Sequence, residues 1–208
     1  MKKILFQGDS ITDTWRDGKT DYHFGFGYAT LVTSKIGNKY PGEYDFSNKG
    51  ISGNRIVDLY ARIKSDIINL KPDYMSILIG INDVWHEVVH KNGVENEKFK
   101  KIYCMLIEEI KEALPDIKIM ILEPFVLKST ATEENWDIFY KETKLRGEAA
   151  KSVAEKYNLT FVPLQDKFNS AMKKYNDALY WTKDGVHPTN AGHQIIAEEW
   201  EKTFEKLL

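Results

Sequence analysis

Three features are scarce in this chain of 208 residues, and each absence excludes a class of protein. It has one cysteine, Cys104, so an internal disulfide and a cysteine-based metal site are both excluded. Its longest apolar stretches, such as residues 75–81, are far shorter than the ~20 residues that a membrane-spanning helix needs. Neither sign of charge dominates, since the net charge of -2 gives no overall attraction for nucleic acid or an anionic membrane. We therefore expect no nucleic-acid or membrane partner, and a cytoplasmic location by default.

The length of the chain suits one hydrophobic core, so we expect a single domain over residues 1–208. No repeat, low-complexity tract or linker-like run divides the sequence. The N-terminal residues are basic and then apolar, which resembles the start of a secretory signal. The apolar part is too short for such a signal, and we interpret it as a strand.

Apolar runs of strand length alternate with longer segments of helical period, the pattern of a parallel sheet covered by helices on both faces. Strands are expected at 3–7, 44–48, 74–79, 117–122 and 160–162. Helices are expected at 27–38, 56–70, 97–114, 136–157 and 191–206, with a shorter one at 165–175. Right-handed crossovers then favour a doubly wound, flavodoxin-like α/β/α fold. Because ligands bind at the carboxyl ends of such strands, Ser10, Gly53 and Asn82 should converge on one edge of the sheet.

Two short motifs near opposite ends of the chain contain the parts of a serine-based catalytic site. Residues 8–12, Gly-Asp-Ser-Ile-Thr, place Ser10 just past the first strand, and residues 184–188, Asp-Gly-Val-His-Pro, place Asp184 three residues before His187. A serine nucleophile needs an adjacent base, and that base needs a third group to hold its tautomer and orientation. Taken alone, Ser10 also fits a helix N-cap. The competing Ser52 lacks the G-x-S-x-G elbow of the α/β-hydrolases, which occurs nowhere in the chain.

The other histidines fit this chemistry less well. His86 and His90 share one expected helix face at a spacing of four and could ligate a metal ion. No third ligand is apparent in the sequence, so we expect no metal site. His193 is interpreted as a surface or packing residue of the last helix, and His23 lies in a charged loop with no assignable partner.

Two further blocks lie between these motifs: residues 48–54, Asn-Lys-Gly-Ile-Ser-Gly-Asn, and residues 80–83, Gly-Ile-Asn-Asp. Together the four blocks resemble those of the GDSL esterases, the SGNH hydrolase family. The resemblance implies a flavodoxin-like fold with a five-stranded parallel sheet, and a reaction that needs no cofactor. It implies Ser10 as nucleophile, His187 as general base and acid, and Asp184 as the orienting carboxylate. The oxyanion hole would comprise the N–H groups of Ser10 and Gly53 and the side-chain amide of Asn82. Taken singly, Gly53 equally fits a turn and Asn82 a helix cap.

The substrate is less sharply defined by the sequence. Trp85 and Trp181 lie near the expected donors and triad, and with Asp9 they are candidate substrate-binding residues. Flat aromatic faces suit sugar rings, although tryptophan is also a common core residue. Asp9 and Asp83 are expected mainly to bond to backbone and shape the loops. These segments resemble the bacterial carbohydrate acetylesterase branch, including acetylxylan esterases, which implies acetylated oligosaccharides such as xylo-oligosaccharides as substrates. The resemblance is also compatible with a homo-oligomer.

Two alternatives stay open from the sequence. The same triad would serve a lysophospholipase or acyl-thioesterase, with Phe24, Phe26 and Tyr28 lining a groove for a long acyl chain. The other alternative is a non-catalytic flavodoxin-like binding module. Its one hint is the Gly-Phe-Gly at residues 25–27, which follows no clear strand and lacks the third glycine of a nucleotide-binding loop.

Overall fold

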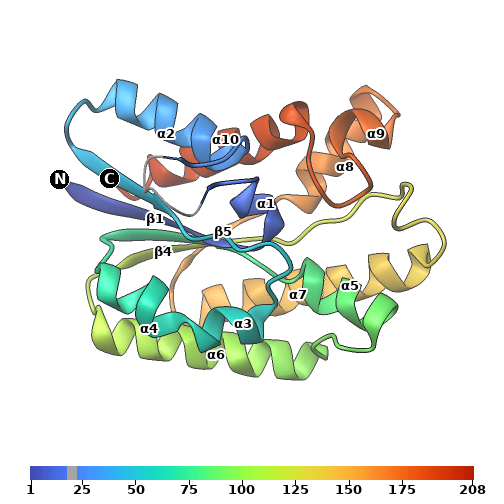
Figure 1. Cartoon of the computed structure of the whole chain (residues 1–208), viewed down its shortest axis with the longest axis horizontal. Coiled ribbons are helices and arrows are strands. Elements are labelled where there is room, and N and C mark those ends of the chain that lie inside the picture. Colours follow the sequence, from blue (N-terminus) through green and yellow to red (C-terminus); the bar gives the residue numbers. More distant parts are fainter. Residues whose placement is uncertain (18–22) are drawn as a thin grey trace.

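The computed structural model describes residues 1–17 and 23–208, and its centre is a five-stranded parallel sheet (Figure 1). The strands are β1 (Lys2–Gly8), β2 (Tyr44–Asn48), β3 (Tyr74–Leu78), β4 (Lys118–Leu122) and β5 (Thr160–Val162). They lie in the order β2-β1-β3-β4-β5, and every neighbouring pair is parallel. This is a doubly wound order. The prediction of an α/β fold with a five-stranded parallel sheet is confirmed.

The three inner strands β1, β3 and β4 are mostly apolar because both faces of the sheet are covered. All five residues of the central strand β3 are buried, as expected for a parallel strand between two layers of helices. Successive side chains point to opposite faces. In β1, Ile4 and Phe6 therefore join one core cluster, whereas Leu5 joins the other.

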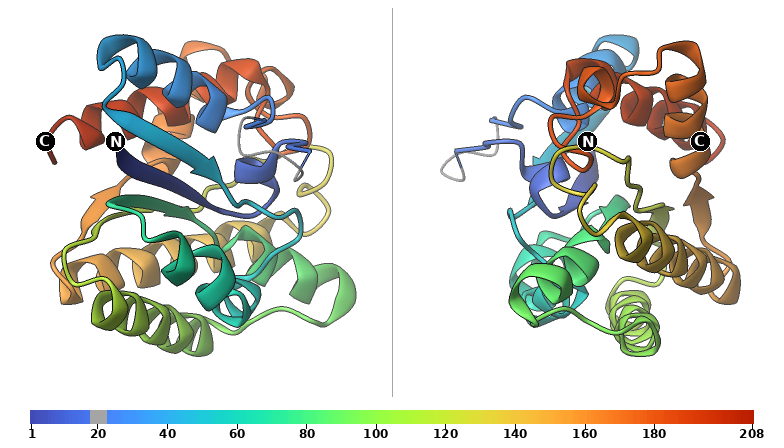
Figure 2. Two further views of the ribbon diagram at one scale, coloured as in Figure 1. Left: turned by 60° about the vertical axis from the view of Figure 1, so that its left-hand side comes forward. Right: turned by 90° about the vertical axis from the view of Figure 1, so that its right-hand side faces the viewer.

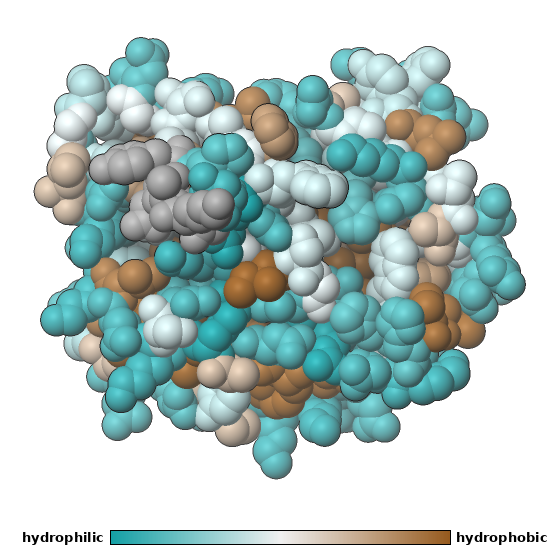
Figure 3. Space-filling model, viewed as in Figure 1, coloured by the Kyte–Doolittle hydropathy of each residue, from teal (hydrophilic) through white to brown (hydrophobic). Residues whose placement is uncertain are grey.

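Helices form a layer on each side of the sheet (Figures 1 and 2). One layer contains α2 (Tyr28–Lys39), α8 (Gln165–Lys174) and α10 (Asn190–Phe204). The other contains α3 (Ile56–Ala61), α6 (Asn96–Ala113) and α7 (Trp136–Lys156). Figure 3 shows one face of the molecule as mostly hydrophilic, with apolar side chains in small separate patches. Within the described residues, no helix is both long and apolar enough to cross a membrane.

The predicted helix at 56–70 is interrupted in the structure. It consists of α3, α4 (Ile63–Asp66) and the 3-10 turn η1 (Ile68–Leu70). Arg62 lies at the first interruption, where its guanidinium donates to the carbonyl oxygens of Gly8 and Lys49. The Gln7 side chain donates to the carbonyl oxygen of Asp66. Contacts with the ends of β1 and β2 therefore bend a segment whose local pattern is helical.

Three helices fall outside the predicted ranges, and each lies next to a site motif. These are α1 (Ser10–Asp13), α5 (Ile81–His90) and α9 (Ala178–Trp181). α1 and α9 have four residues each, which is barely one turn and too short to show a hydrophobic period. They result from capping, since the side chains of Asp9 and Asp177 accept hydrogen bonds from N–H groups in their first turns.

Candidate active site

The ends of three neighbouring strands bring distant residues together. Ser10 begins α1 directly after β1, Gly53 follows β2, and Asn82 lies in the first turn of α5 after β3. With Asp184 and His187 from the loop before α10, these residues line one cleft with a volume of about 1100 Å³. The predicted convergence on one edge of the sheet is therefore present in the structure.

A chain of hydrogen bonds joins Ser10, His187 and Asp184. Ser10 Oγ lies 2.9 Å from His187 Nε2, although the two residues are 177 positions apart. His187 Nδ1 lies 2.6 Å from Asp184 Oδ2. The other carboxylate oxygen, Oδ1, accepts from the backbone N–H groups of Val186 and His187 at 2.9 and 2.8 Å. A carboxylate held in this way keeps the proton on Nδ1, so Nε2 can accept the serine proton.

The charges in this chain of contacts favour a basic imidazole. The hydrogen bond to Asp184 raises the pKa of His187 against the opposing effect of burial. Burial acts to raise the pKa of Asp184, but hydrogen bonds from the His187 side chain and from backbone N–H groups lower it overall. Asp184 is therefore ionised over the pH range in which His187 gains or loses its proton. Its negative charge can stabilise the imidazolium that forms when Ser10 loses its proton.

Gly53 and Asn82 face the same cleft as candidate oxyanion donors. Gly53 has a φ of +82°, in the left-handed region that favours glycine, and a Cβ there would be 4.0 Å from His86 Cε1. Asn82 Nδ2 donates to the carbonyl oxygen of Asn54 at 3.1 Å. An amide nitrogen carries two hydrogens, so this bond can orient the group while the second hydrogen stays available to a substrate.

Asp9 and Asp83 are fully buried and bond to backbone, as the sequence led us to expect. Asp9 Oδ1 accepts from Ile11 N at 2.9 Å, and burial raises the pKa of Asp9 to about 7. Both oxygens of Asp83 accept from Ile56 N, which ties α5 to α3. The predicted contact of Asp9 with substrate has no support in this geometry, because Asp9 is buried and is not among the residues that line the cleft.

The two candidate tryptophans have different surroundings. Trp85 lines the cleft, with its ring centroid 5.8 Å from that of His187. Trp181 is buried in the core, where its Nε1 donates to the carbonyl oxygen of Tyr175. Trp181 is not among the residues that line the cleft, so the geometry gives no support to its predicted role as a substrate platform. Tryptophan is large enough to fill a core from a position adjacent to a site, which the sequence pattern cannot reveal.

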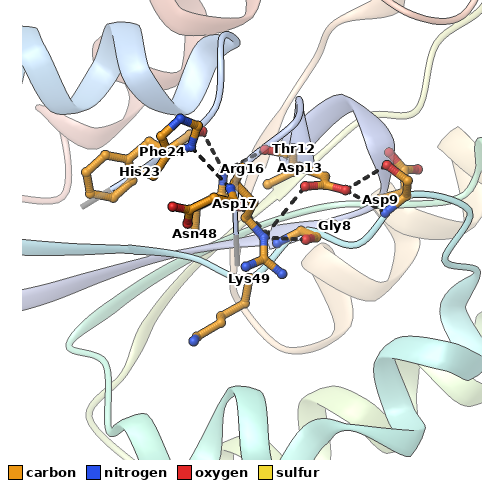
Figure 4. A network of polar contacts seen from close by, with 12 residues as sticks. Gly8, Asp9, Thr12, Asp13, Arg16, Asp17, His23, Phe24, Asn48 and Lys49 are labelled. Carbon is orange, nitrogen blue, oxygen red and sulfur yellow. Dashed lines mark hydrogen bonds and ion pairs between the residues drawn. The ribbon is translucent and has the colours of Figure 1, made fainter. Parts of the chain in front are cut away.

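His193 has a more specific environment than the sequence indicated. It is buried, lines the cleft, and accepts a hydrogen bond from Tyr28 N through Nδ1. Burial lowers its pKa to about 4, so the ring is neutral at physiological pH. His23, predicted to have no assignable partner, accepts from Asp17 N (Figure 4).

His86 and His90 both line the cleft, with ring centroids 5.8 Å apart. In the part of the chain that the structure describes, no group of three or more His, Cys, Asp or Glu side chains could hold a metal ion. Two exposed aromatic residues, Trp15 and Phe26, also line the cleft. The sequence suggested Phe26 as part of a groove for a long acyl chain, and it did not indicate Trp15.

Comparisons with known proteins show the family of the chain. The model of the GDSL-like lipase/acylhydrolase family matches residues 6–195. The acetylxylan esterase of Geobacillus stearothermophilus is 37% identical over 207 residues, covering 94% of this chain and 90% of that protein. A structure described as a GDSL-like lipase from Parabacteroides merdae has a TM-score of 0.92 and 36% identity, covering 98% of this chain and 95% of the other.

A further similar structure is that of Axe2, an acetylxylan esterase from Geobacillus stearothermophilus. Its structure has a TM-score of 0.85 and 35% identity to this chain, covering 97% of this chain and 93% of Axe2. Structures are also known for catalytic mutants of Axe2 in which a serine, an aspartate or a histidine is replaced by alanine. These three residue types are the ones joined by hydrogen bonds in the cleft described above.

Proposed function

We propose that this chain, which belongs to the GDSL-like lipase/acylhydrolase family and is an ester hydrolase, removes acetyl groups from acetylated oligosaccharides such as xylo-oligosaccharides. The observation that carries the proposal is the hydrogen-bonded line from Asp184 through His187 to Ser10 at the wall of a large cleft. The similarity to acetylxylan esterases supports the choice of acetyl group and sugar.

In the first half-reaction, Ser10 Oγ attacks the carbonyl carbon of the acetyl ester, and its proton passes to His187 Nε2. The negative oxygen that develops is held by the N–H groups of Ser10 and Gly53 and by the Asn82 amide. The bond between the carbonyl carbon and the sugar oxygen then breaks. His187 returns the proton to that oxygen, which leaves an acetyl group on Ser10.

In the second half-reaction, His187 removes a proton from a water molecule that attacks the acetyl-serine. The same donors hold the second oxyanion, and its collapse releases acetate and restores the Ser10 hydroxyl. Asp184 stabilises the imidazolium in both halves, because it accepts a hydrogen bond from Nδ1 throughout. All the proton transfers run through one imidazole.

The size of the cleft leaves room for a leaving group much larger than the acetyl group. A cleft of about 1100 Å³ greatly exceeds the space that an acetyl group needs. The lysophospholipase alternative requires an apolar groove, for which the sequence suggested Phe24, Phe26 and Tyr28. Tyr28 is fully buried and Phe24 packs against the core, so only Phe26 of the three lines the cleft.

Paired serine variants test the nucleophile. We expect Ser10→Ala to lower acetate release from acetylated xylo-oligosaccharides by a factor of about 10⁴ or more, with an unchanged circular dichroism spectrum. A fluorophosphonate should label the wild type on the peptide containing Ser10 and should not label the variant. Ser52 is the matched control, because its hydroxyl donates to Asp13 Oδ2 at 2.7 Å and is not bonded to an imidazole. Ser52→Ala should still be labelled.

Two results would overturn the proposal. Acetate release by Ser10→Ala at the wild-type rate would show that Ser10 is not the nucleophile. The wild type could also strongly prefer decanoyl over acetyl esters and release no acetate from acetylated xylo- or mannosaccharides. That result would show that the substrate is a long-chain ester and not an acetylated sugar.

A further inference from the structure

Two consecutive residues in the cleft wall have an unusual backbone. Thr14 and Trp15 follow α1 and have φ values of +41° and +63°. The left-handed region is unfavourable for a residue with a Cβ atom, and a bulky side chain there is an outlier. Such strain persists only where the surrounding structure imposes it, and it is concentrated at ligand-binding and catalytic sites. The strained pair lines the cleft together with Ser10 and His187.

Neighbouring segments hold this turn in place. Thr14 N donates to the carbonyl oxygen of Ser10 at 3.1 Å, and Phe26 N donates to the carbonyl oxygen of Thr14 at 3.0 Å. Gly25 packs so closely that a Cβ atom would lie 2.4 Å from the Thr14 carbonyl oxygen. The backbone beside Trp15 is therefore fixed from both sides.

The side chains that flank the turn connect it to the loop that carries Gly53. Asp13 Oδ2 accepts from both the N–H and the hydroxyl of Ser52. Arg16 Nε donates to the carbonyl oxygen of Gly50 at 2.7 Å. Figure 4 shows Asp13 and Arg16 pointing toward one another, with 3.7 Å between Arg16 Nε and Asp13 Oδ1. The residues on both sides of Trp15 are thus held by contacts with α1 and with the loop that carries Gly53, and the Trp15 side chain takes no part in these contacts.

The Trp15 indole is directed to solvent although the chain has a large core. Its exposed fraction is 81%, and that of Phe26, which lies in the same cleft wall, is 73%. Leaving two large aromatic side chains in water forgoes the stabilisation that burial would provide. Together with the strained backbone, this exposure indicates selection for contact with a ligand in the cleft.

We propose that the Trp15 indole is the surface on which the sugar ring of the leaving alcohol stacks, with Phe26 beside it. The inference rests on the proposed function. A pyranose ring presents apolar C–H groups on its faces, which pack against an aromatic plane. Asp13 and Arg16 also line the cleft, and the hydrogen-bonding capacity that their protein partners leave free can serve ring hydroxyl groups. Trp15 is therefore a specificity-determining residue for the leaving group.

Replacement of Trp15 by glycine separates binding from folding. Glycine adopts positive φ without a steric penalty, so Trp15→Gly should have an unchanged or higher Tm. Its kcat/KM for acetylated xylo-oligosaccharides should fall about threefold to tenfold, mainly through KM, in line with the loss of one aromatic stacking contact. Its kcat/KM for methyl acetate, which has no ring to stack, should change less than about twofold. Trp15→Phe should restore most of the activity on the oligosaccharide.

Lys71 provides the matched control, since it has a φ of +51° and lies at the end of η1, outside the cleft. Lys71→Gly also places glycine at a position with positive φ, and it should leave kcat/KM unchanged for both substrates. An equal loss on methyl acetate and oligosaccharide in Trp15→Gly would show that Trp15 only maintains the turn. A lower Tm, or an oligomeric wild type that Trp15→Gly converts to a monomer, would show a packing or subunit contact instead.

The failure of this inference can be told apart from failure of the proposed function. If the wild type releases acetate from the oligosaccharides and Trp15→Gly does so with the same KM, only the stacking role is overturned. If the wild type cleaves methyl acetate but none of the oligosaccharides, the proposed function fails and the stacking role fails with it.

Discussion

The Asp184 carboxylate performs two tasks at the scale of a single residue. One oxygen bonds to the imidazole of His187, and the other accepts two backbone N–H groups of the following turn. The same carboxylate therefore shapes the loop and orients the base. The short spacing of Asp184 and His187 makes this arrangement largely independent of the rest of the fold, which explains why it can be recognised in a sequence.

Asn82 is the residue for which we predict a loss of rate without a loss of structure. Asn82→Ala removes one of three proposed oxyanion donors and should lower kcat about 10²- to 10³-fold on methyl acetate, with little change in KM. Asn82→Asp preserves the shape of the side chain but replaces the donor with a carboxylate, so it should be equally impaired. The measurements are steady-state kinetics and Tm. Full activity in Asn82→Asp would show that the amide does not stabilise the oxyanion.

At the scale of elements, the strands were predictable and the short helices beside the site were not. β2 and β5, the two edge strands, have the predicted bounds, because a short run with alternating or apolar side chains is a purely local signal. α1 depends on a cap by Asp9, and the interruption after α3 depends on Arg62 reaching two carbonyl oxygens of other segments. These hydrogen bonds depend on the folded structure, so the local sequence pattern cannot predict the helix boundaries that they set.

The loop that carries the base should be sensitive to its glycine. Gly185 has a φ of +105°, and a Cβ atom would lie 2.5 Å from the carbonyl oxygen of Leu127 and 2.7 Å from Thr132 Oγ1. Gly185→Ala should therefore lower the free energy of unfolding by about 2 kcal/mol or more. It should also lower kcat at least about tenfold, because the loop positions Asp184 and His187.

Gly42 offers a matched control for this substitution. Its φ of +79° is also in the left-handed region, but a Cβ atom there would meet nothing within 4 Å. Gly42→Ala should cost about 1 kcal/mol from the backbone alone and leave kcat unchanged. Equal effects of the two substitutions on Tm and kcat, measured by thermal unfolding and initial rates, would contradict the importance of the close packing around Gly185.

At the scale of the whole molecule, the cleft wall is the feature that the sequence predicted least completely. Ser10, Asp184, His187, Gly53 and Asn82 were predicted from motifs, strand ends and the resemblance to GDSL esterases, and all five line the cleft. Trp15 was not identified, because its exposure follows from a backbone turn clamped by Phe26 and Gly25 from a different segment. The burial of His193 likewise depends on the packing of α10 against α2. The wall of the cleft thus includes residues that no motif marks.

Two buried groups should make opposite contributions to the pH dependence of stability. The pKa of His193 is about 4 in the folded chain against 6.5 for an unburied histidine. The unfolded state then binds more protons between these values, so the contribution is present above pH 6.5 and about 3 kcal/mol is lost as the pH falls to 4. The pKa of Asp9 is about 7 in the folded chain against 3.8. Its contribution of about 4 kcal/mol is present below pH 3.8 and is lost as the pH rises through 7.

Because the two contributions have opposite signs over the same pH range, each should become visible only when the other is removed. Urea unfolding of the wild type, Asp9→Asn and His193→Asn at pH 7, 6, 5 and 4 provides the measurement. Relative to the wild type, Asp9→Asn should lose stability as the pH falls, and His193→Asn should gain it. All other titrating groups are common to the three proteins, so they cancel in the differences. Three parallel curves would mean that neither group changes its proton affinity on folding.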